Sequence, residues 1–319
     1  MSPGRRSRGG PPVRTPGSPR GAGTARSGST ARSGSTARAA GSAAAGSASA
    51  RAPGRSTSGA DAASGRRSQG RRGLGGDQVE GRRAVRELLA ARRRPVRDVW
   101  LSDGVTDAAI VGEIVNLAER AGVPVRRVSR ARLDAEARTE SAQGVLAHAR
   151  ELGEAALDDL LHDAPDGRPP FLLVIDGVTD PHNLGALLRT AELAGASGVV
   201  LARHRAAHVT PTVAKAAAGA IEYLPIAVVP GIPAALSQLG DHGIWTVGLD
   251  AGADASVFDL DLADQPVALV VGAEGPGLSR LTRARCDVLV AVPQRGRLAS
   301  LNVAAAGAIA AFEIARRRS

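Results

Sequence analysis

Hydrophobic residues follow two patterns along this chain, short apolar runs and segments with helical spacing, and from about residue 76 onwards the two alternate. The clearest run, at 171–175, is wholly apolar and is typical of a strand buried on both faces. After a loop, leucines and alanines recur at helical spacing over 184–194, Gly195 ends that helix, and 198–201 forms the next apolar run. The pattern predicts a strand-loop-helix-strand unit, whose loop lies where open parallel sheets bind ligands.

Strands and helices continue to alternate up to the last residue. We predict further helices at 212–220, 232–239, 278–283 and 302–316, and further strands at 224–228, 244–249, 267–271 and 288–292. This alternation indicates the α/β class, with a parallel sheet that has helices on both faces. We expect the alanine-rich last helix to be buried along much of its length.

A smaller α/β domain is predicted over residues 76–150, separated by a linker at 151–170 from the domain at 171–319. Its first helix is expected to carry Val79, Val85, Leu88 and Leu89, and the linker to contain a short helix at 155–161. The remaining elements are strands at 96–101, 123–128 and 144–147 and helices at 110–120 and 129–137. Arginines at the ends of these elements could contact phosphate or be solvated loop residues, namely Arg92 to Arg94, Arg126, Arg127, Arg130 and Arg132.

The positive charge of the chain lies in its N-terminal segment. The whole chain has a formal net charge of +10, whereas residues 1–75 hold fourteen arginines and one aspartate, so that the rest of the chain sums to −3. This segment is rich in Gly, Ser, Ala and Arg and cannot bury enough apolar surface to fold, so we expect a disordered basic tail. Two roles stay open for it: an arm that attracts RNA, or a solvated segment without a specific partner.

Cysteine usage and hydropathy restrict the class of protein. Cys286 is the only cysteine, which excludes an intramolecular disulfide and a thiolate metal cluster, and no His, Cys or carboxylate cluster has the spacing of a metal site. We find neither the apolar core of a signal peptide nor a run of about 18 apolar residues. We therefore expect a cytoplasmic protein that needs no metal and does not enter a membrane.

Three loops that follow apolar strands carry most of the candidate chemistry. The first contains Asn183 and leads to Arg189; a purely structural interpretation makes the former a helix N-cap and the latter a solvated residue. The second, at 272–278, combines three glycines with Glu274, and the third, at 293–302, leads into the last helix. No Gly-x-Gly-x-x-Gly pattern follows the first strand, which disfavours a dinucleotide-dependent oxidoreductase.

Taken together, the three loops resemble the signature motifs of the SpoU, or TrmH, family of RNA ribose 2′-O-methyltransferases, which belong to the knotted SPOUT class. The matching residues are Asp180-Pro181-x-Asn183-x-Gly185-x-x-x-Arg189-Thr190, Gly272-x-Glu274-Gly275-x-Gly277 and Ser300-Leu301-Asn302, and Ala142-Gln143-Gly144-Val145 matches in the smaller domain. The resemblance implies a trefoil-knotted methyltransferase domain at 171–319. It also implies that residues 76–150 form a ribosomal-protein-like domain that binds the substrate.

The same resemblance implies a cofactor and a substrate. The cofactor is S-adenosylmethionine, and the residues that contact it by resemblance are Gly272, Val292 and Leu301. The substrate is RNA, with a guanosine of 23S rRNA favoured by the presence of the smaller domain, and the family implies a homodimer. Two alternatives stay open: methylation of tRNA, and a non-catalytic RNA-binding or ribosome-assembly factor.

The family implies catalytic roles for Arg189, Asn183, Glu274, Ser300 and Asn302. A free guanidine is a physically demanding base because arginine side chains are normally cationic. We therefore favour an Arg189 that binds the adjacent phosphate and stabilises the developing alkoxide while phosphate or water takes the proton. The two asparagines and the serine would orient Arg189 and the ribose. Glu274 either fixes Arg189 or a backbone turn, or it is a structural carboxylate of the loop.

Overall fold

The structure, a computed structural model, describes residues 73–105, 109–162, 167–262, 264–298 and 300–318, so the expectation of a disordered tail falls almost wholly outside the described residues. The C-terminal part contains a six-stranded sheet in the order β10-β8-β9-β5-β6-β7. Every neighbouring pair in it is parallel, as predicted. Its strands are β5 (Phe171–Ile175), β6 (Gly198–Ala202), β7 (Ile226–Val229), β8 (Trp245–Leu249), β9 (Val267–Val271) and β10 (Val288–Val290).

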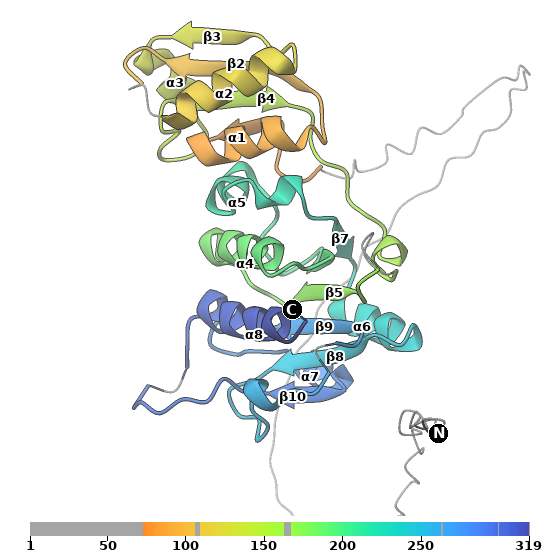
Figure 1. Cartoon of the computed structure of the whole chain (residues 1–319). Helices are drawn as coiled ribbons and strands as arrows, with labels where there is room; N and C mark the ends of the chain where they lie inside the picture. Colours follow the sequence, from red (N-terminus) through yellow and green to blue (C-terminus); the bar gives the residue numbers. More distant parts are fainter. Residues whose placement is uncertain (1–72, 106–108, 163–166, 263, 299, 319) are drawn as a thin grey trace, which may run out of the picture. The chain divides into compact units, whose positions relative to one another are not determined.

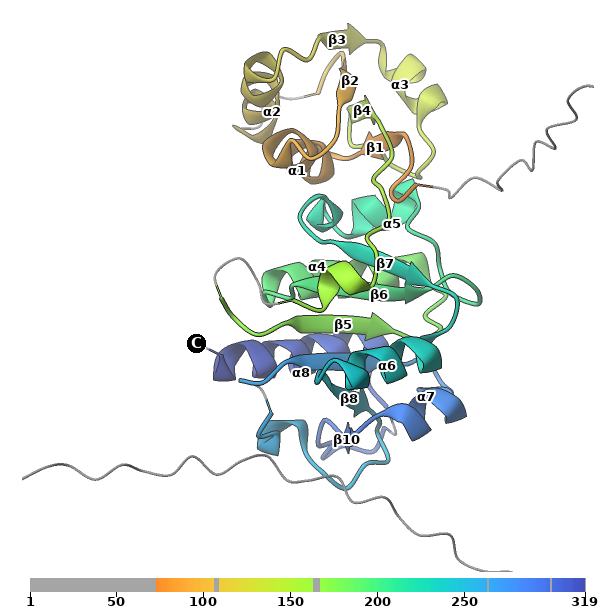
Figure 2. The same ribbon diagram turned by 90° about the vertical axis from the view of Figure 1, so that its right-hand side faces the viewer.

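Helices cover both faces of this sheet, because alternate residues of its central strands point to opposite sides. Leu173 of β5 packs in one core with α4, α5 and α8, whereas Leu172 packs in a second core with α6. Figure 2 shows β7, β6 and β5 in succession, with the helices alongside. These helices are α4 (Pro181–Leu193), α5 (Pro211–Ala216), α6 (Ile232–Asp241), α7 (Arg280–Arg285) and α8 (Val303–Arg317), with short 3-10 turns η2 (Ala220–Glu222) and η3 (Val257–Asp259).

The start of α4 differs from the structural interpretation of its sequence. Asp180, not Asn183, is the N-cap, and its carboxylate accepts a hydrogen bond from the backbone N–H of His182 at 3.0 Å. That bond holds the pKa of Asp180 below its usual value. Pro181 takes the first helical position, where its missing N–H costs nothing. Asn183 is therefore not the capping residue, and it lies in the first turn of α4. At the other end Gly195, which was predicted to end this helix, has φ 74°, a left-handed conformation that favours glycine.

Close packing places α5 directly against α4. A Cβ on Gly185 would lie 2.4 Å from the Cβ of Ala216, so only glycine fits at this position of α4. Figure 1 shows α1, α5, α4 and α8 in that order, each next to the following one. The helix that carries Asn183 and Arg189 is thus held between α5 and α8.

The N-terminal part contains a mixed four-stranded sheet in the order β1-β4-β2-β3, in which only β2 and β3 are parallel. Its elements are β1 (Gln78–Glu80), α1 (Arg82–Ala91), β2 (Val96–Ser102), α2 (Ala109–Arg120), β3 (Val125–Val128), α3 (Arg130–Glu136) and β4 (Val145–Ala149). The expectation that Val79 starts the first helix was wrong, since Val79 lies in β1 and the helix begins after Gly81. An α/β fold was predicted for this part, and the structure confirms it.

Two further expectations need correction. The helix expected at 155–161 is only a 3-10 turn, η1 (Asp158–Leu160). Helix α8 is buried along one face alone, because Ile309 and Phe312 are 36% and 48% exposed. Among the described residues no helix has the length and apolarity that crossing a membrane requires. The trefoil knot and the likeness to a ribosomal protein stay predictions.

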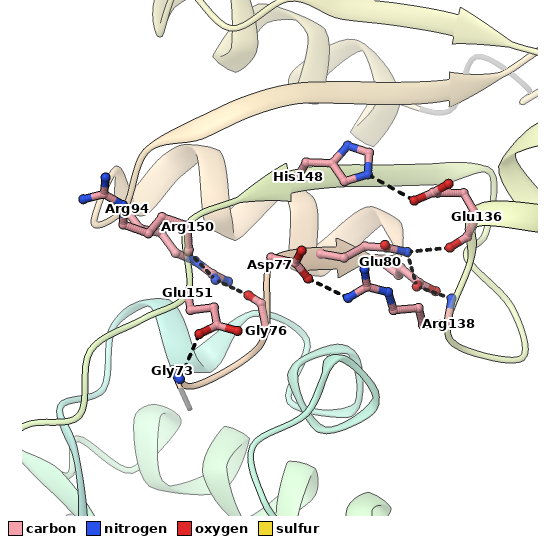
Figure 3. A network of polar contacts seen from close by, with 11 residues as sticks. Gly73, Gly76, Asp77, Glu80, Arg94, Glu136, Arg138, His148, Arg150 and Glu151 are labelled. Carbon is pink, nitrogen blue, oxygen red and sulfur yellow. Dashed lines mark hydrogen bonds and ion pairs between the residues drawn. The ribbon is translucent and has the colours of Figure 1, made fainter. Parts of the chain in front are cut away.

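A buried ion pair joins the two sheet regions. Arg94, in the turn after α1, donates from Nε and Nη2 to the two carboxylate oxygens of Glu222 in η2, at 3.1 and 2.6 Å. Its Nη1 also donates to the carbonyl oxygens of Gly76 and Arg150, at 3.0 and 2.9 Å (Figure 3). The two charged side chains are only 2% and 1% exposed. Arg94 is therefore unavailable to RNA phosphate, although its position at the end of an element had made it a candidate.

Candidate active site

The first two sequence loops meet because β5 and β9 are neighbours in the parallel sheet, and their carboxyl ends lie at the same edge. Asn183 follows β5 and Glu274 follows β9. The side-chain amide of Asn183 donates a hydrogen bond to the Glu274 carboxylate. Two residues that are 91 positions apart in the sequence are thus in contact. Through this hydrogen bond Glu274 fixes the orientation of the Asn183 amide.

The third loop joins the same network through Asn302. Its Nδ2 donates to Oδ1 of Asn183 at 3.1 Å, so the amide of Asn183 also fixes the orientation of the amide of Asn302. Its Oδ1 accepts the backbone N–H groups of Ala304 and Ala305, at 2.9 and 3.2 Å, which makes Asn302 the N-cap of α8. Glu274, Asn183 and Asn302 therefore form a hydrogen-bonded chain that ties the start of α8 to the ends of β5 and β9.

A cavity of about 360 Å³ lies beside this chain. All three residues expected to contact the cofactor line it, namely Gly272, Val292 and Leu301, together with Glu274, Ser300 and Asn302. Besides its polar side chains, among them Asp250, Gln294 and Ser300, the wall consists of glycines and small or apolar residues. A flat apolar ring held mainly by main-chain hydrogen bonds would fit such a wall, which suits the adenine of S-adenosylmethionine.

The glycines of the second loop allow its backbone to fold tightly. A Cβ on Gly272 would lie 2.2 Å from the carbonyl carbon of Gly277, because Ala273 and Gly277 exchange two backbone hydrogen bonds at 2.9 and 3.0 Å that close the loop on itself. Gly275 and Gly277 have φ of 78° and 69°, which disfavours any other residue. The glycines thus shape this wall of the cavity by letting the backbone fold tightly.

The sequence analysis did not identify one residue of this cavity, Asp250. Asp250 follows β8, the strand next to β9, and lines the same cavity. Its carboxylate is held by Arg283 of α7 at 2.6 Å and accepts the N–H of Gly252 at 2.8 Å. The signal was present, because residues 244–249 were predicted as a strand and ligands bind at the carboxyl ends of parallel strands. An isolated aspartate without a motif does not stand out by itself.

Arg189 is not brought to this cavity. It lies six residues after Asn183 on α4, which is about 240° around the helix, and it lines a separate cavity next to Arg83 and Tyr223. Arg189 is exposed, and it forms no hydrogen bond or ion pair with any residue that the structure describes. Four of the five residues expected to act in catalysis therefore gather around one cavity, and the arginine stands apart from them.

Comparison with known sequences gives the class of protein. The SpoU rRNA Methylase family matches residues 170–312, and the family described as RNA 2'-O ribose methyltransferase substrate binding matches residues 78–155. The chain belongs to the SpoU family and carries the substrate-binding domain in addition to the methyltransferase domain.

Individual relatives agree with this membership. The chain is 42% identical to the 23S rRNA (guanosine-2'-O-)-methyltransferase RlmB of Pseudomonas syringae, over 74% of this chain and 94% of the relative. It is 37% identical to the putative TrmH family tRNA/rRNA methyltransferase YacO of Bacillus subtilis, with the same coverage. Such identity over nearly the full length of each relative supports a common fold for both domains.

Solved structures show the same arrangement. The SpoU methyltransferase AviRb of Streptomyces viridochromogenes, crystallised with the cofactor AdoMet, superposes with a TM-score of 0.62 at 26% identity, covering 76% of this chain and 90% of that one. An AdoMet-bound rRNA methyltransferase of Sinorhizobium meliloti superposes with a TM-score of 0.61 at 25% identity, covering 77% and 88%. Members of this family therefore bind S-adenosylmethionine, the cofactor that the sequence motifs implied.

Proposed function

We propose that this protein transfers a methyl group from S-adenosylmethionine to the ribose 2′-oxygen of a guanosine in 23S rRNA. The observation that carries the proposal is the cavity lined by Gly272, Val292 and Leu301. Glu274 and Asn302 also line it, and both are hydrogen-bonded to Asn183. The similarity to RlmB enzymes over both domains supports the rRNA substrate. We place the reaction in the cytoplasm, where ribosomal RNA is found.

The cofactor, when bound, supplies a methyl group on a positively charged sulfur, so the reaction forms an oxygen–carbon bond and breaks a carbon–sulfur bond. The residues of this chain have to align the 2′-oxygen with that methyl group and raise the charge on the oxygen. Alignment alone contributes up to about 7–11 kcal/mol. We assign it to the amides of Asn183 and Asn302, which are already oriented by their hydrogen bonds, and to Ser300, which lines the cavity.

Arg189 has the second task in this proposal. Its guanidinium binds the phosphate next to the reacting ribose in a bidentate manner and stabilises the developing alkoxide. The proton of the 2′-hydroxyl passes to phosphate or water. Because Arg189 does not line the cavity of its own chain, it has to meet a cavity on another copy.

We therefore propose a homodimer in which Arg189 of the partner subunit completes each site. Ala305, Ile309 and Phe312 are exposed on α8 and, at spacings of four and three residues, lie on one helical face. Exposed apolar residues that share one helical face can pack against the same face of a second copy. This face belongs to the helix that Asn302 caps, so the interface and the cavity share one element.

The test is methyl transfer from radiolabelled S-adenosylmethionine to unmodified transcripts of 23S rRNA, 16S rRNA and tRNA, with the wild type and the Arg189→Ala variant side by side. We expect label in 23S rRNA alone, at a single dinucleotide that resists alkali, and almost none with the variant. Label in tRNA would replace the substrate and keep the chemistry. No label in any RNA, with cofactor binding intact, would contradict the enzyme and favour an RNA-binding assembly factor.

A further inference from the structure

A second cavity, of about 520 Å³, lies where α1 and α2 of the substrate-binding domain face α4 and the turn after α5. In contrast to the cofactor cavity, many of its lining residues are charged. They include the arginines Arg83, Arg86 and Arg189 and the glutamates Glu87 and Glu192. Positive charges outnumber negative ones at a place where both domains contribute to the wall.

Two of these arginines are free to bind a ligand. Arg86 is paired, because it donates to Glu87 and Glu113 at 2.5 and 2.8 Å, and those ion pairs raise its pKa. Arg83 and Arg189 are exposed and form no hydrogen bond or ion pair with any described residue. The paired charges largely cancel, so two unpaired guanidinium groups and the carboxylate of Glu192 determine the potential of the cavity.

The two walls are held together by several polar contacts. The hydroxyl of Tyr223 donates to Glu87 of α1 at 2.7 Å, and Arg93 donates to the carbonyl oxygen of Leu224 at 2.8 Å. The buried pair of Arg94 and Glu222, described above, lies in the same junction. These contacts fix the position of α1 on the turn after α5. The cavity that Arg83 and Arg189 line is therefore formed before any ligand binds.

We propose that Arg83 binds a phosphate of the substrate RNA in this cavity, which Arg189 also lines, and so positions the strand between the two domains. The inference rests on the proposed function. In the proposed dimer Arg189 belongs to the reaction site, so an RNA bound there lies next to this cavity. The planar guanidinium fork suits phosphate oxygens, and a neutral ligand would gain nothing from two unpaired cations. Arg83 is then a positioning residue, because it holds a neighbouring phosphate and does not touch the reacting atoms.

The test measures RNA binding by Arg83→Ala at several salt concentrations. We expect about tenfold weaker binding and a salt slope (log affinity against log salt) reduced by about 0.7–0.9, the value for one lost phosphate contact. The KM for RNA should rise by a similar factor, with kcat at saturating RNA and the affinity for S-adenosylmethionine unchanged. Arg83→Lys keeps the charge and should recover part of the affinity.

A variant of opposite sign makes the test specific for charge. Glu192→Gln removes the unpaired carboxylate from the wall and should strengthen RNA binding by a few-fold, because the repulsion of phosphate is lost. Two matched controls are Arg280→Ala and Glu119→Gln, at exposed residues that do not line this cavity. Arg280 lies on α7, which packs beside α6 on the opposite face of the sheet from α4. Both controls should bind RNA as the wild type does.

The outcomes separate this inference from the proposed function. If the wild type methylates 23S rRNA while Arg83→Ala keeps the affinity and the salt slope of the wild type, the phosphate site is refuted and the function stands. An equal loss with Arg280→Ala would also refute it, because any surface arginine would then act alike. If the wild type neither binds nor methylates RNA, the proposed function itself fails.

Discussion

Two arginines of this protein, Arg94 and Arg189, differ in burial and in their hydrogen-bond partners. Arg94 is 2% exposed and donates to both oxygens of Glu222 and to two backbone carbonyls, so all of its charge is used inside the molecule. Arg189 is exposed and, within the described chain, has no partner. The first arginine holds the structure together, and the second is available to bind something from outside. Arginine content alone says nothing about which of the two roles a residue has.

The largest effect is expected from breaking the buried pair. Arg94→Ala leaves the Glu222 carboxylate buried without a cation, so the free energy of unfolding should fall by about 3–5 kcal/mol in denaturant titrations. The double variant Arg94→Met/Glu222→Leu removes both charges and should lose far less. A loss below about 1 kcal/mol for Arg94→Ala would show that the pair is not buried as described.

Arg189→Ala should have the reverse signature. Because the side chain is exposed and unpaired, stability and cofactor affinity should stay at the wild-type level. Methyl transfer should fall by about 10²–10³-fold, or ~2.7–4 kcal/mol, as for the loss of one group that stabilises a developing oxyanion. Near-normal turnover by Arg189→Lys would contradict the need for a planar guanidinium.

A smaller effect is expected at the cap of α8, which connects the cavity to the helix. Asn302→Ala removes the cap of Ala304 and Ala305 and should lower the free energy of unfolding by about 1 kcal/mol. Asn302→Asp keeps the capping oxygen, which a helix N-terminus favours, but loses the amide that donates to Asn183. The aspartate variant should therefore keep stability and lose methyl transfer; equal losses of stability in both variants would contradict this division.

The smallest effect is expected at Cys286. Burial raises the pKa of its thiol to about 12, so at pH 8 it is protonated and should react with iodoacetamide far more slowly than a free thiol. The rate should rise to that of an exposed cysteine on unfolding in denaturant. Rapid alkylation of the native protein would show that α7 opens readily. The residue can then report on unfolding in the experiments with Arg94.

The apolar pattern predicted most of the C-terminal fold. Residues 171–175 and 267–271 form strands with the predicted bounds, because wholly apolar runs of five residues between turn residues are too short for a helix and typical of a buried strand. Short elements were harder, and Val79 was placed in a helix because three residues of β1 carry no periodicity of their own. The segment 155–161 has helical spacing but forms a single 3-10 turn, too short for spacing to decide.

The chemistry of the site was predictable where motifs existed and only there. Gly272, Val292 and Leu301 line one cavity, as the resemblance implied, although their roles in binding stay a proposal. The partner of Arg94 could not be predicted, because Glu222 lies 128 residues further on and only the fold brings the two together. The separation of Arg189 from the cavity follows from helix geometry. The sequence pattern does not indicate which arginine, if not Arg189 of the same chain, reaches the cavity.

Subunit mixing tests the central claim, that the cavity of one chain is completed by Arg189 of the partner subunit. Arg189→Ala keeps the cavity, while Gly272→Ala collapses it, because a Cβ there would overlap the backbone of Gly277. Each variant alone should be inactive. In equal mixture, allowed to exchange subunits, half of the dimers carry one intact site, and methyl transfer should return to about a quarter of the wild-type rate. No recovery, with mixed dimers demonstrated by two affinity tags, would contradict the claim.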